Sequence, residues 1–201
     1  MKITWLGHSC FKIETNNESI VLDPYKDGYV DGLAPLREIA DLVLCSHEHG
    51  DHGARECVQL TGKETHFKIE TISSYHDDKQ GTLRGNNIIH KISDGTYTLA
   101  HLGDLGCPLT NEQINHLKNL DVLLIPVGGF YTIDSQQARI IVEQIQPKIT
   151  IPMHYKGKDF GYDVLETVEP FLSTFENVTR IEGNSIRVEN HLDNPVIVLN
   201  L

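Results

Sequence analysis

The segment His47-Glu48-His49-Gly50-Asp51-His52 places four candidate metal ligands within six residues. It directly follows residues 41–45, a continuous apolar run that predicts a strand buried on both faces. Imidazole nitrogens and carboxylate oxygens are the ligands that catalytic zinc sites use. A tight loop at the glycine lets the first two histidines face one ion while the aspartate and the last histidine face another, about 3.5–4 Å away. A solvated polar loop is the competing interpretation, and it explains this spacing poorly.

One loop cannot complete two coordination spheres, so we expect further ligands at the ends of other strands. Active sites of layered α/β folds collect at the carboxyl ends of strands, where isolated polar residues follow apolar runs. Each such residue alone would be an ordinary surface position, and their shared location is what makes them candidates. Three residues fit this description: His76, Asp104 and His154.

The remaining chain predicts a mixed α and β fold with sheets in the middle and helices outside. Apolar runs predict strands at residues 2–6, 10–14, 19–22, 41–45, 65–74, 88–92, 96–102, 121–126 and 148–151, with two or three more between 178 and 201. Helices are expected at residues 34–40, 54–60, 111–119, 134–146 and 162–175. No linker-like segment interrupts the chain, so residues 1–201 are predicted to form a single domain.

Composition limits the classes of partner. The formal net charge of −11 argues against nucleic acid or an anionic membrane, because both require clustered Lys and Arg. A small anionic substrate stays possible, since bound divalent cations reverse the local field. The four cysteines are scattered, and neither a signal peptide nor a membrane span is evident, so a reducing, cytoplasmic location is expected. The oligomeric state is left open.

The order of these motifs is similar to that of the metallo-β-lactamase superfamily: H-x-H-x-D-H, a lone His, a Gly-Asp and a late His. The segments Trp5-Leu6-Gly7-His8-Ser9 and Leu22-Asp23-Pro24 extend the resemblance. They point to the branch of small, stand-alone hydrolases that is similar to ascorbate-6-phosphate lactonase. The chain has no insertion large enough for a nucleic-acid clamp, which disfavours the RNA-processing branch.

This resemblance implies a fold and a set of roles. The fold is a four-layer αβ/βα sandwich of two mixed sheets flanked by helices, with two metal ions at one edge. Asp23 would support the ligand loop from behind, as metal ligands commonly require. Zinc is the expected metal, with manganese or iron as alternatives. The implied ligands are His47, His49 and His76 for the first ion, Asp51, His52 and His154 for the second, and Asp104 as the bridge.

The expected chemistry is hydrolysis. Two cations that share one water should give a bridging hydroxide that attacks the carbonyl or phosphoryl centre of a lactone, ester or phosphodiester. Asp51 or Asp104 is expected to steer the water proton. The resemblance places the loop of His8 at the rim of the site, where His8 is expected to contact substrate or to support a ligand from behind rather than to form a simple turn. Arg84 is the other candidate substrate contact, and it can bind an anion through two nitrogens. A structural salt bridge is an equally open role for Arg84.

Two other functions remain compatible with the ligand set: a redox protein that holds two irons, and a metal-stabilised binding protein without turnover. Asp77 and Asp78 are expected to cap a turn or helix, and Cys107 to serve packing. The remaining histidines have no partners at ligand spacing and are predicted to be ordinary core or surface residues: His66, His90, His101, His116 and His191.

Overall fold

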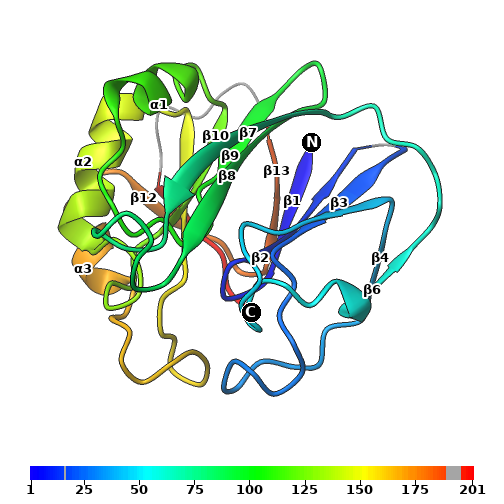
Figure 1. Cartoon of the computed structure of the whole chain (residues 1–201), viewed down its shortest axis with the longest axis horizontal. Coiled ribbons are helices and arrows are strands. Elements are labelled where there is room, and N and C mark those ends of the chain that lie inside the picture. The colour runs from blue at the N-terminus through cyan, green and yellow to red at the C-terminus, as the bar shows by residue number, and fades with distance from the viewer. Residues whose placement is uncertain (16, 189–195) are drawn as a thin grey trace.

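Two mixed β-sheets face each other in the computed structural model, which describes residues 1–15, 17–188 and 196–201 (Figure 1). The first sheet has the strand order β13-β1-β2-β3-β5. Its strands are β1 (Lys2–Gly7), β2 (Cys10–Glu14), β3 (Ser19–Leu22), β5 (Leu42–Leu44) and β13 (Ser185–Arg187). Only the β3–β5 pair of this sheet is parallel among the described residues.

The second sheet has the order β12-β14-β11-β10-β9-β8-β7. It is parallel from β12 to β9 and antiparallel from β9 to β7. Its strands are β7 (Lys68–Tyr75), β8 (Asn86–Ser93), β9 (Thr98–His101), β10 (Val122–Pro126), β11 (Ile149–Met153), β12 (Val178–Arg180) and β14 (Val196–Val198). The two predicted mixed sheets are therefore confirmed.

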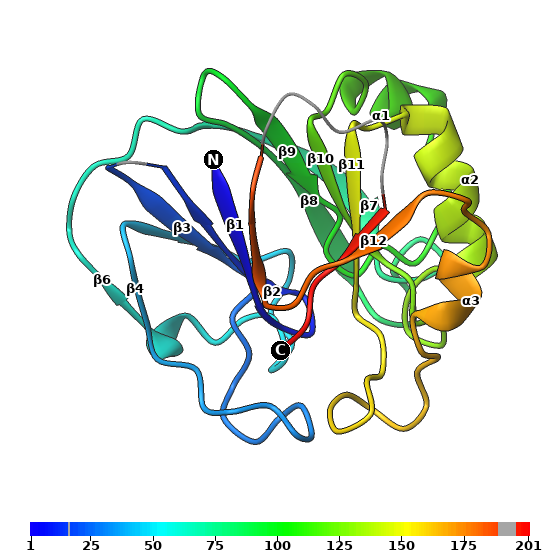
Figure 2. The same ribbon diagram turned by 180° about the vertical axis from the view of Figure 1, so that it is seen from behind.

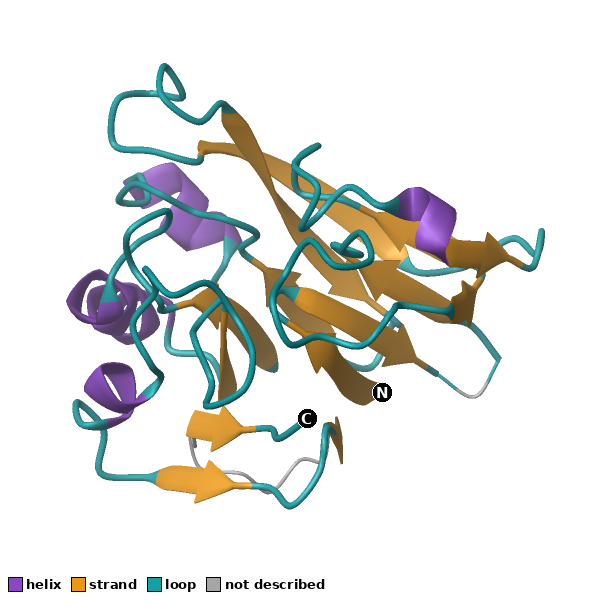
Figure 3. Ribbon diagram, turned by 90° about the horizontal axis from the view of Figure 1, so that it is seen from below, coloured by secondary structure: helices purple, strands orange, loops and turns teal. Residues whose placement is uncertain are grey.

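Apolar side chains from both sheets meet in one core. The first sheet contributes alternate residues such as Trp5 and Phe11, and the second contributes Leu99 and Leu124. Every residue of β10 and β11 is buried, because helices cover the far face of that sheet. These helices are α1 (Asn111–His116), α2 (Ser135–Ile145) and α3 (Glu169–Leu172), and all three lie on the same side of the molecule (Figure 3).

The outer face of the first sheet is covered differently from the prediction. The helices expected at residues 34–40 and 54–60 are wrong. Those segments instead hold β4 (Glu38–Ala40), a short 3-10 helix (Arg55–Cys57) and β6 (Val58–Leu60), and β4 and β6 pair in parallel outside the first sheet (Figure 2). Short segments of this kind carry little helical stability of their own. Their few apolar residues pack against the outward side chains of β2 and β3.

The helix expected at residues 162–175 is also wrong over most of its length, because only α3 is helical. Pro170 fixes the start of α3. The backbone before it is bound to distant loops: Gly161 N donates to Asp31 O at 2.9 Å, and Glu166 N donates to Gly128 O at 2.9 Å. His191 lies outside the described residues. Within the described part, no helix is long and apolar enough to cross a bilayer.

Asp134 caps the start of α2, and its removal should destabilise the fold measurably. Its Oδ1 accepts a hydrogen bond from Gln137 N at 2.8 Å, and Gln137 Oε1 accepts one from Asp134 N at 3.0 Å. We expect Asp134→Ala to lower the free energy of unfolding by about 1 kcal/mol in urea titrations. Glu143→Ala, which removes only an exposed pair with Arg139, should cost about 0.3 kcal/mol. Equal losses in the two variants would contradict the capping role.

Candidate metal centre

All seven predicted ligands lie together at one edge of the two facing sheets. His47, His49, Asp51 and His52 occupy the loop after β5, while His76, Asp104 and His154 follow β7, β9 and β11. These three strands run in the same direction, because β8 is antiparallel to both β7 and β9, and β9 is parallel to β10 and β11. Their carboxyl ends therefore meet at the same edge as the loop.

Asp104 lies at the centre of this cluster. Its Oδ2 is 3.1 Å from His76 Nε2, 3.3 Å from His154 Nε2 and 3.9 Å from His47 Nε2. Its Oδ1 is 3.1 Å from His52 Nε2. Burial alone would raise the pKa of Asp104, yet the nearby His154 and His52 hold it well below its usual value. The carboxylate therefore faces histidines from every part of the cluster.

The histidines and carboxylates separate into two groups around Asp104. The ligand atoms of His47, His49 and His76 lie within 4.8 Å of one another. Those of Asp51, His52 and His154 do so as well, together with His8. A third group, His47, His52 and Asp104, joins the two. The first two groups contain the ligand sets that the resemblance implied, and Asp104 belongs to the one that joins them.

The cluster fits divalent cations by an independent criterion. His47 Nε2, His52 Nε2 and Asp104 Oδ1 are buried and have no hydrogen-bond partner among the described residues. Leaving such groups unpaired costs about 1–3 kcal/mol each. His52 Nε2 lies 3.1 Å from Asp104 Oδ1, and His47 Nε2 lies 3.9 Å from Asp104 Oδ2. Two ligand atoms that share a tetrahedral ion at about 2.0–2.1 Å are about 3.3 Å apart. The residues present therefore suit a metal pair.

Asp23 fixes the orientation of His52 from behind the cluster. This wholly buried carboxylate accepts hydrogen bonds from Ser46 N and Ser46 Oγ, both at 2.6 Å, and from His52 Nδ1 at 2.7 Å. Burial would raise the pKa of Asp23, but His101, His52 and these hydrogen bonds keep it well below its usual value. Because a carboxylate only accepts, Nδ1 of His52 carries a hydrogen, and Nε2 is the ring nitrogen that would bind an ion.

Asn87 holds the turn that carries Asp104, a role that sequence reasoning missed. Its Oδ1 accepts from Asp104 N at 2.9 Å, while its Nδ2 donates to Leu102 O at 2.9 Å. Gly103 has a φ of 56°, and a Cβ there would lie 2.4 Å from Asn87 Oδ1 and 2.4 Å from Ser46 Cβ. The glycine before Asp104 was the one available signal of this crowding.

A cavity of about 440 Å³ opens onto the cluster. His49, Asp51, His76 and Asp104 form its floor, and Arg84 and three tyrosines complete its lining. These tyrosines come from three separate loops: Tyr29, Tyr131 and Tyr162. Their rings give a polar metal site largely aromatic walls.

Arg84 and Tyr162 have distinct positions in this lining. The Arg84 guanidinium lies 5.5 Å from the centre of the Tyr131 ring, and within the described part of the chain it forms no ion pair. The structural salt bridge that we had considered is therefore not observed. Asp77, as predicted, caps the loop that carries Arg84, since its carboxylate accepts from the backbone nitrogens of Lys79, Gly81, Leu83 and Arg84. Tyr162 Oη donates to Asp51 Oδ2 at 3.2 Å.

His8 does not occupy the rim position expected for a substrate contact. It is wholly buried, it does not line the cavity, and its ring centre is 4.1 Å from that of His154. Burial, followed by repulsion from His154, lowers the pKa of His8 to about 4, so the ring is neutral at pH 7. The turn after β1 folds this side chain under the cluster and away from the opening.

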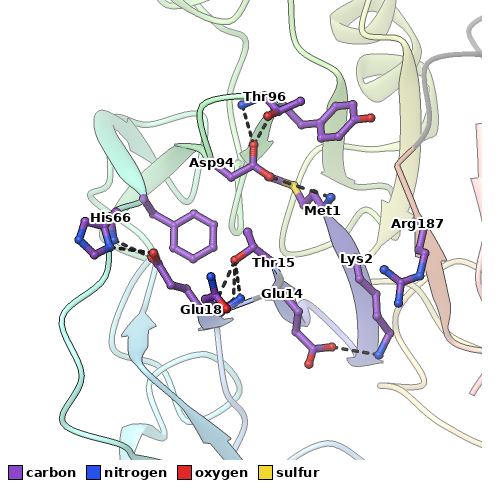
Figure 4. A pocket seen from close by; sticks show the side chains of 12 residues that line it. Met1, Lys2, Glu14, Thr15, Glu18, His66, Asp94, Thr96 and Arg187 are labelled. Atoms are coloured by element: carbon purple, nitrogen blue, oxygen red, sulfur yellow. Dashed lines mark hydrogen bonds and ion pairs between the residues drawn. The ribbon is translucent and has the colours of Figure 1, made fainter.

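A second hollow lies at the opposite edge of the sheets, near the amino end of β1 (Figure 4). Its charged side chains are mostly matched to one another: Lys2 pairs with Glu14 at 3.0 Å, and His66 with Glu18 at 2.8 Å. None of the candidate ligand groups found among the described residues includes a residue of this hollow. The functional site is therefore assigned to the cluster around Asp104.

Comparisons with known proteins agree with this geometry. Residues 2–154 match the family model described as a beta-lactamase superfamily domain. A UPF0173 metal-dependent hydrolase from Carboxydothermus hydrogenoformans is 27% identical over 94% of this chain and 97% of its own length. A UPF0173 protein from Pyrococcus furiosus is 31% identical over 77% of this chain and 83% of its own.

A solved structure shows the same relationship. The protein is from Thermotoga maritima, belongs to the metallo-beta-lactamase superfamily and is 31% identical to this chain. It superposes with a TM-score of 0.76 and covers 99% of both chains. From this match, the family model and the named relatives, we conclude that the chain belongs to the metallo-beta-lactamase superfamily and is a metal-dependent hydrolase.

Proposed function

We propose that the chain hydrolyses a small anionic lactone, ester or phosphodiester with the help of two divalent metal ions. The observation that carries this proposal is Asp104, which lies between two groups of histidines at the floor of an open cavity. His47, His49 and His76 would hold one ion, Asp51, His52 and His154 the other, and Asp104 would contact both. Zinc is the metal we expect, and manganese or iron suits the same ligands.

Two carboxylates that line the cavity are the groups able to accept or donate a proton there. When bound, a pair of cations lowers the pKa of water and polarises a carbonyl or phosphoryl oxygen. Asp51 and Asp104 both line the cavity and are within reach of water held in it. The hydrogen bond from Tyr162 keeps Asp51 in place, and the pKa of Tyr162 is raised by burial and by Asp51, so this tyrosine keeps its proton.

Arg84 makes an anionic substrate the best match for the cavity. It is a cation without a carboxylate partner in the described structure, and it lines the cavity beside flat aromatic walls. A volume of about 440 Å³ is typical of sites for small molecules. With a net charge of −11, the chain has no general electrostatic attraction to nucleic acid or to an anionic membrane, so we expect neither as a partner. A cytoplasmic location suits four unpaired cysteines.

An activity screen of the metal-loaded protein over lactones, phosphodiesters and thioesters tests this function. We expect hydrolysis of at least one class and its loss in His49→Ala. Hydrolysis that survives in His49→Ala would exclude the mechanism. Bound iron with visible absorbance and no hydrolysis would favour the redox alternative, and tightly bound metal without any turnover would favour a binding protein.

Arg84 should determine the preference for charged substrates. We expect Arg84→Ala to raise KM for an anionic substrate by about 10- to 100-fold, because a hydrogen bond to a charged group is worth about 1.5–3 kcal/mol. A neutral ester should be hydrolysed with an unchanged KM. Arg180→Ala removes an exposed arginine that pairs with Glu169 outside the cavity, and it should alter neither value. An equal rise in KM for neutral and anionic substrates would show that Arg84 does not contact the anion.

A further inference from the structure

We propose that His8 is an additional ligand of the ion assigned to Asp51, His52 and His154, so that protein coordinates this second ion more fully than the first. The proposal rests on the metal-dependent function argued above. It assigns His8 a role different from the substrate contact that its sequence position suggested.

The backbone around His8 is built to hold its ring under the cluster. His8 has a φ of 52°, which a residue with a side chain seldom adopts, and it follows Gly7 at an irregularity in the β1–β2 pairing. Its carbonyl accepts hydrogen bonds from Trp5 Nε1 at 2.9 Å and from His154 N at 3.3 Å. A strained backbone of this kind persists where the surrounding structure determines it, and such positions cluster at functional sites.

The ring nitrogens of His8 have the environment of a metal ligand. The ligand atoms of His8, Asp51, His52 and His154 all lie within 4.8 Å of one another. His8 Nε2 is 3.4 Å from Asp51 Oδ2, close to the distance of about 3.3 Å expected for two ligands of one tetrahedral ion. Neither ring nitrogen has a hydrogen-bond partner among the described residues, although the side chain is wholly buried. A cation between these four side chains would satisfy Nε2.

Adding His8 makes the two ion positions unequal. His8, His52 and His154 are each 0% exposed, and none of them lines the cavity. Asp51 is the one residue of this group that lines it, whereas His49 and His76 of the other group both do. With Asp104 counted for both ions, the first would have four protein ligands and the second five, so protein surrounds the second more fully. We therefore expect the first ion, with two histidine ligands that line the cavity, to exchange ligands with the cavity more readily than the second.

Another buried histidine provides a matched comparison. His90 is 4% exposed, and its Nδ1 also lacks a partner among the described residues. Its Nε2, however, is 3.1 Å from the carbonyl oxygen of Cys45, and His90 belongs to none of the candidate ligand groups. An unpaired ring nitrogen therefore occurs in this fold outside any candidate metal site. What distinguishes His8 is that its ligand atom converges with those of three other side chains.

Zinc titration of the metal-free protein tests the proposal. We expect the wild type and His90→Gln to bind two equivalents. His8→Ala should bind the first equivalent normally and lose at least about 100-fold in affinity for the second, because even residues behind the ligands account for about 10- to 100-fold. Two equivalents bound by His8→Ala within about threefold of the wild-type affinity would overturn the role of His8. A wild type that binds no zinc would instead overturn the proposed function.

A measurement on the wild type keeps the proposal testable if His8→Ala does not fold. In zinc-loaded protein with ¹⁵N-labelled histidine, long-range ¹H–¹⁵N spectra distinguish metal-bound ring nitrogens from protonated and free ones. Of the eleven histidines, we expect six with a metal-bound nitrogen: His8 and the five predicted ligand histidines. Five metal-bound rings, with both His8 nitrogens unchanged by zinc, would refute the inference.

Discussion

Asp104→Asn is expected to reduce kcat/KM by at least about 1000-fold and to prevent tight binding of the second metal ion. Asparagine has nearly the shape of aspartate, so the turn behind Gly103 and its hydrogen bond to Asn87 should survive. What disappears is the negative charge that faces Nε2 of His52, His76 and His154 at 3.1–3.3 Å. Zinc content and hydrolysis rates measured on the same preparation would show both losses.

Asp121→Asn is the matched control for this substitution. Asp121 is also a buried aspartate that precedes a strand of the second sheet, where it accepts from Thr98 N at 2.7 Å and pairs with Lys148 at 2.8 Å. It lies at the amino end of β10, away from the edge that carries the cluster. We expect it to keep two metal ions and full activity. More than about a tenth of the wild-type kcat/KM in Asp104→Asn would contradict the central role of this carboxylate.

The positions of the seven candidate ligands could be predicted because two simple signals coincide. Each residue has a ligand-type side chain, and each follows an apolar run that reads as a strand. Strand direction then brings His76, Asp104 and His154 to one edge, although 78 positions separate the first from the last. The same apolar runs predict the strands of the two sheets, because few other structures bury short segments continuously or at every second residue.

The predictions failed where the local structure depends on pairing between residues far apart in the sequence. Residues 34–40 and 54–60 are short enough to form either a helical turn or a strand, and the β4–β6 pairing selects the strand. The three tyrosines of the cavity reach it from loops whose paths depend on contacts such as Gly161 N to Asp31 O. The sequence predicts His8 near the site. That its side chain is buried under the cluster follows from a positive φ, which the sequence does not reveal.

Buried residues behind the cluster hold the ligand side chains in position through their own hydrogen bonds. Asp23, Ser46, Asn87 and His101 are all buried, and their hydrogen bonds run to backbone or to the far side of a ligand. The side chains that point inward are left with unpaired atoms. The fold thus holds the ligands in place while several of their buried atoms stay unpaired, an arrangement that favours metal binding.

Asp23→Ala should show this coupling between fold and metal most clearly. The variant leaves Ser46 and His52 Nδ1 without the acceptor that they share, inside a region closed to water. Removing one partner of a buried pair costs about 3–5 kcal/mol, so the free energy of unfolding should fall by that amount in metal-free urea titrations. His52 also loses the bond that orients it, so affinity for the second zinc ion should fall by about 10- to 100-fold.

Ser46→Ala separates these two effects. It removes one donor to Asp23 and the 2.9 Å contact of Ser46 Oγ with His47 Nδ1, but it leaves the His52–Asp23 hydrogen bond at 2.7 Å intact. We expect a loss of about 1 kcal/mol in stability and little change in affinity for the second zinc ion, because the lost contact with His47 concerns the first. If Asp23→Ala instead lowers stability while the second zinc ion binds as in the wild type, the orientation of His52 does not depend on Asp23. The ligand geometry would then have to be set by the loop backbone alone, because Gly53 N and His52 N both donate to His49 O at 2.8 and 3.0 Å.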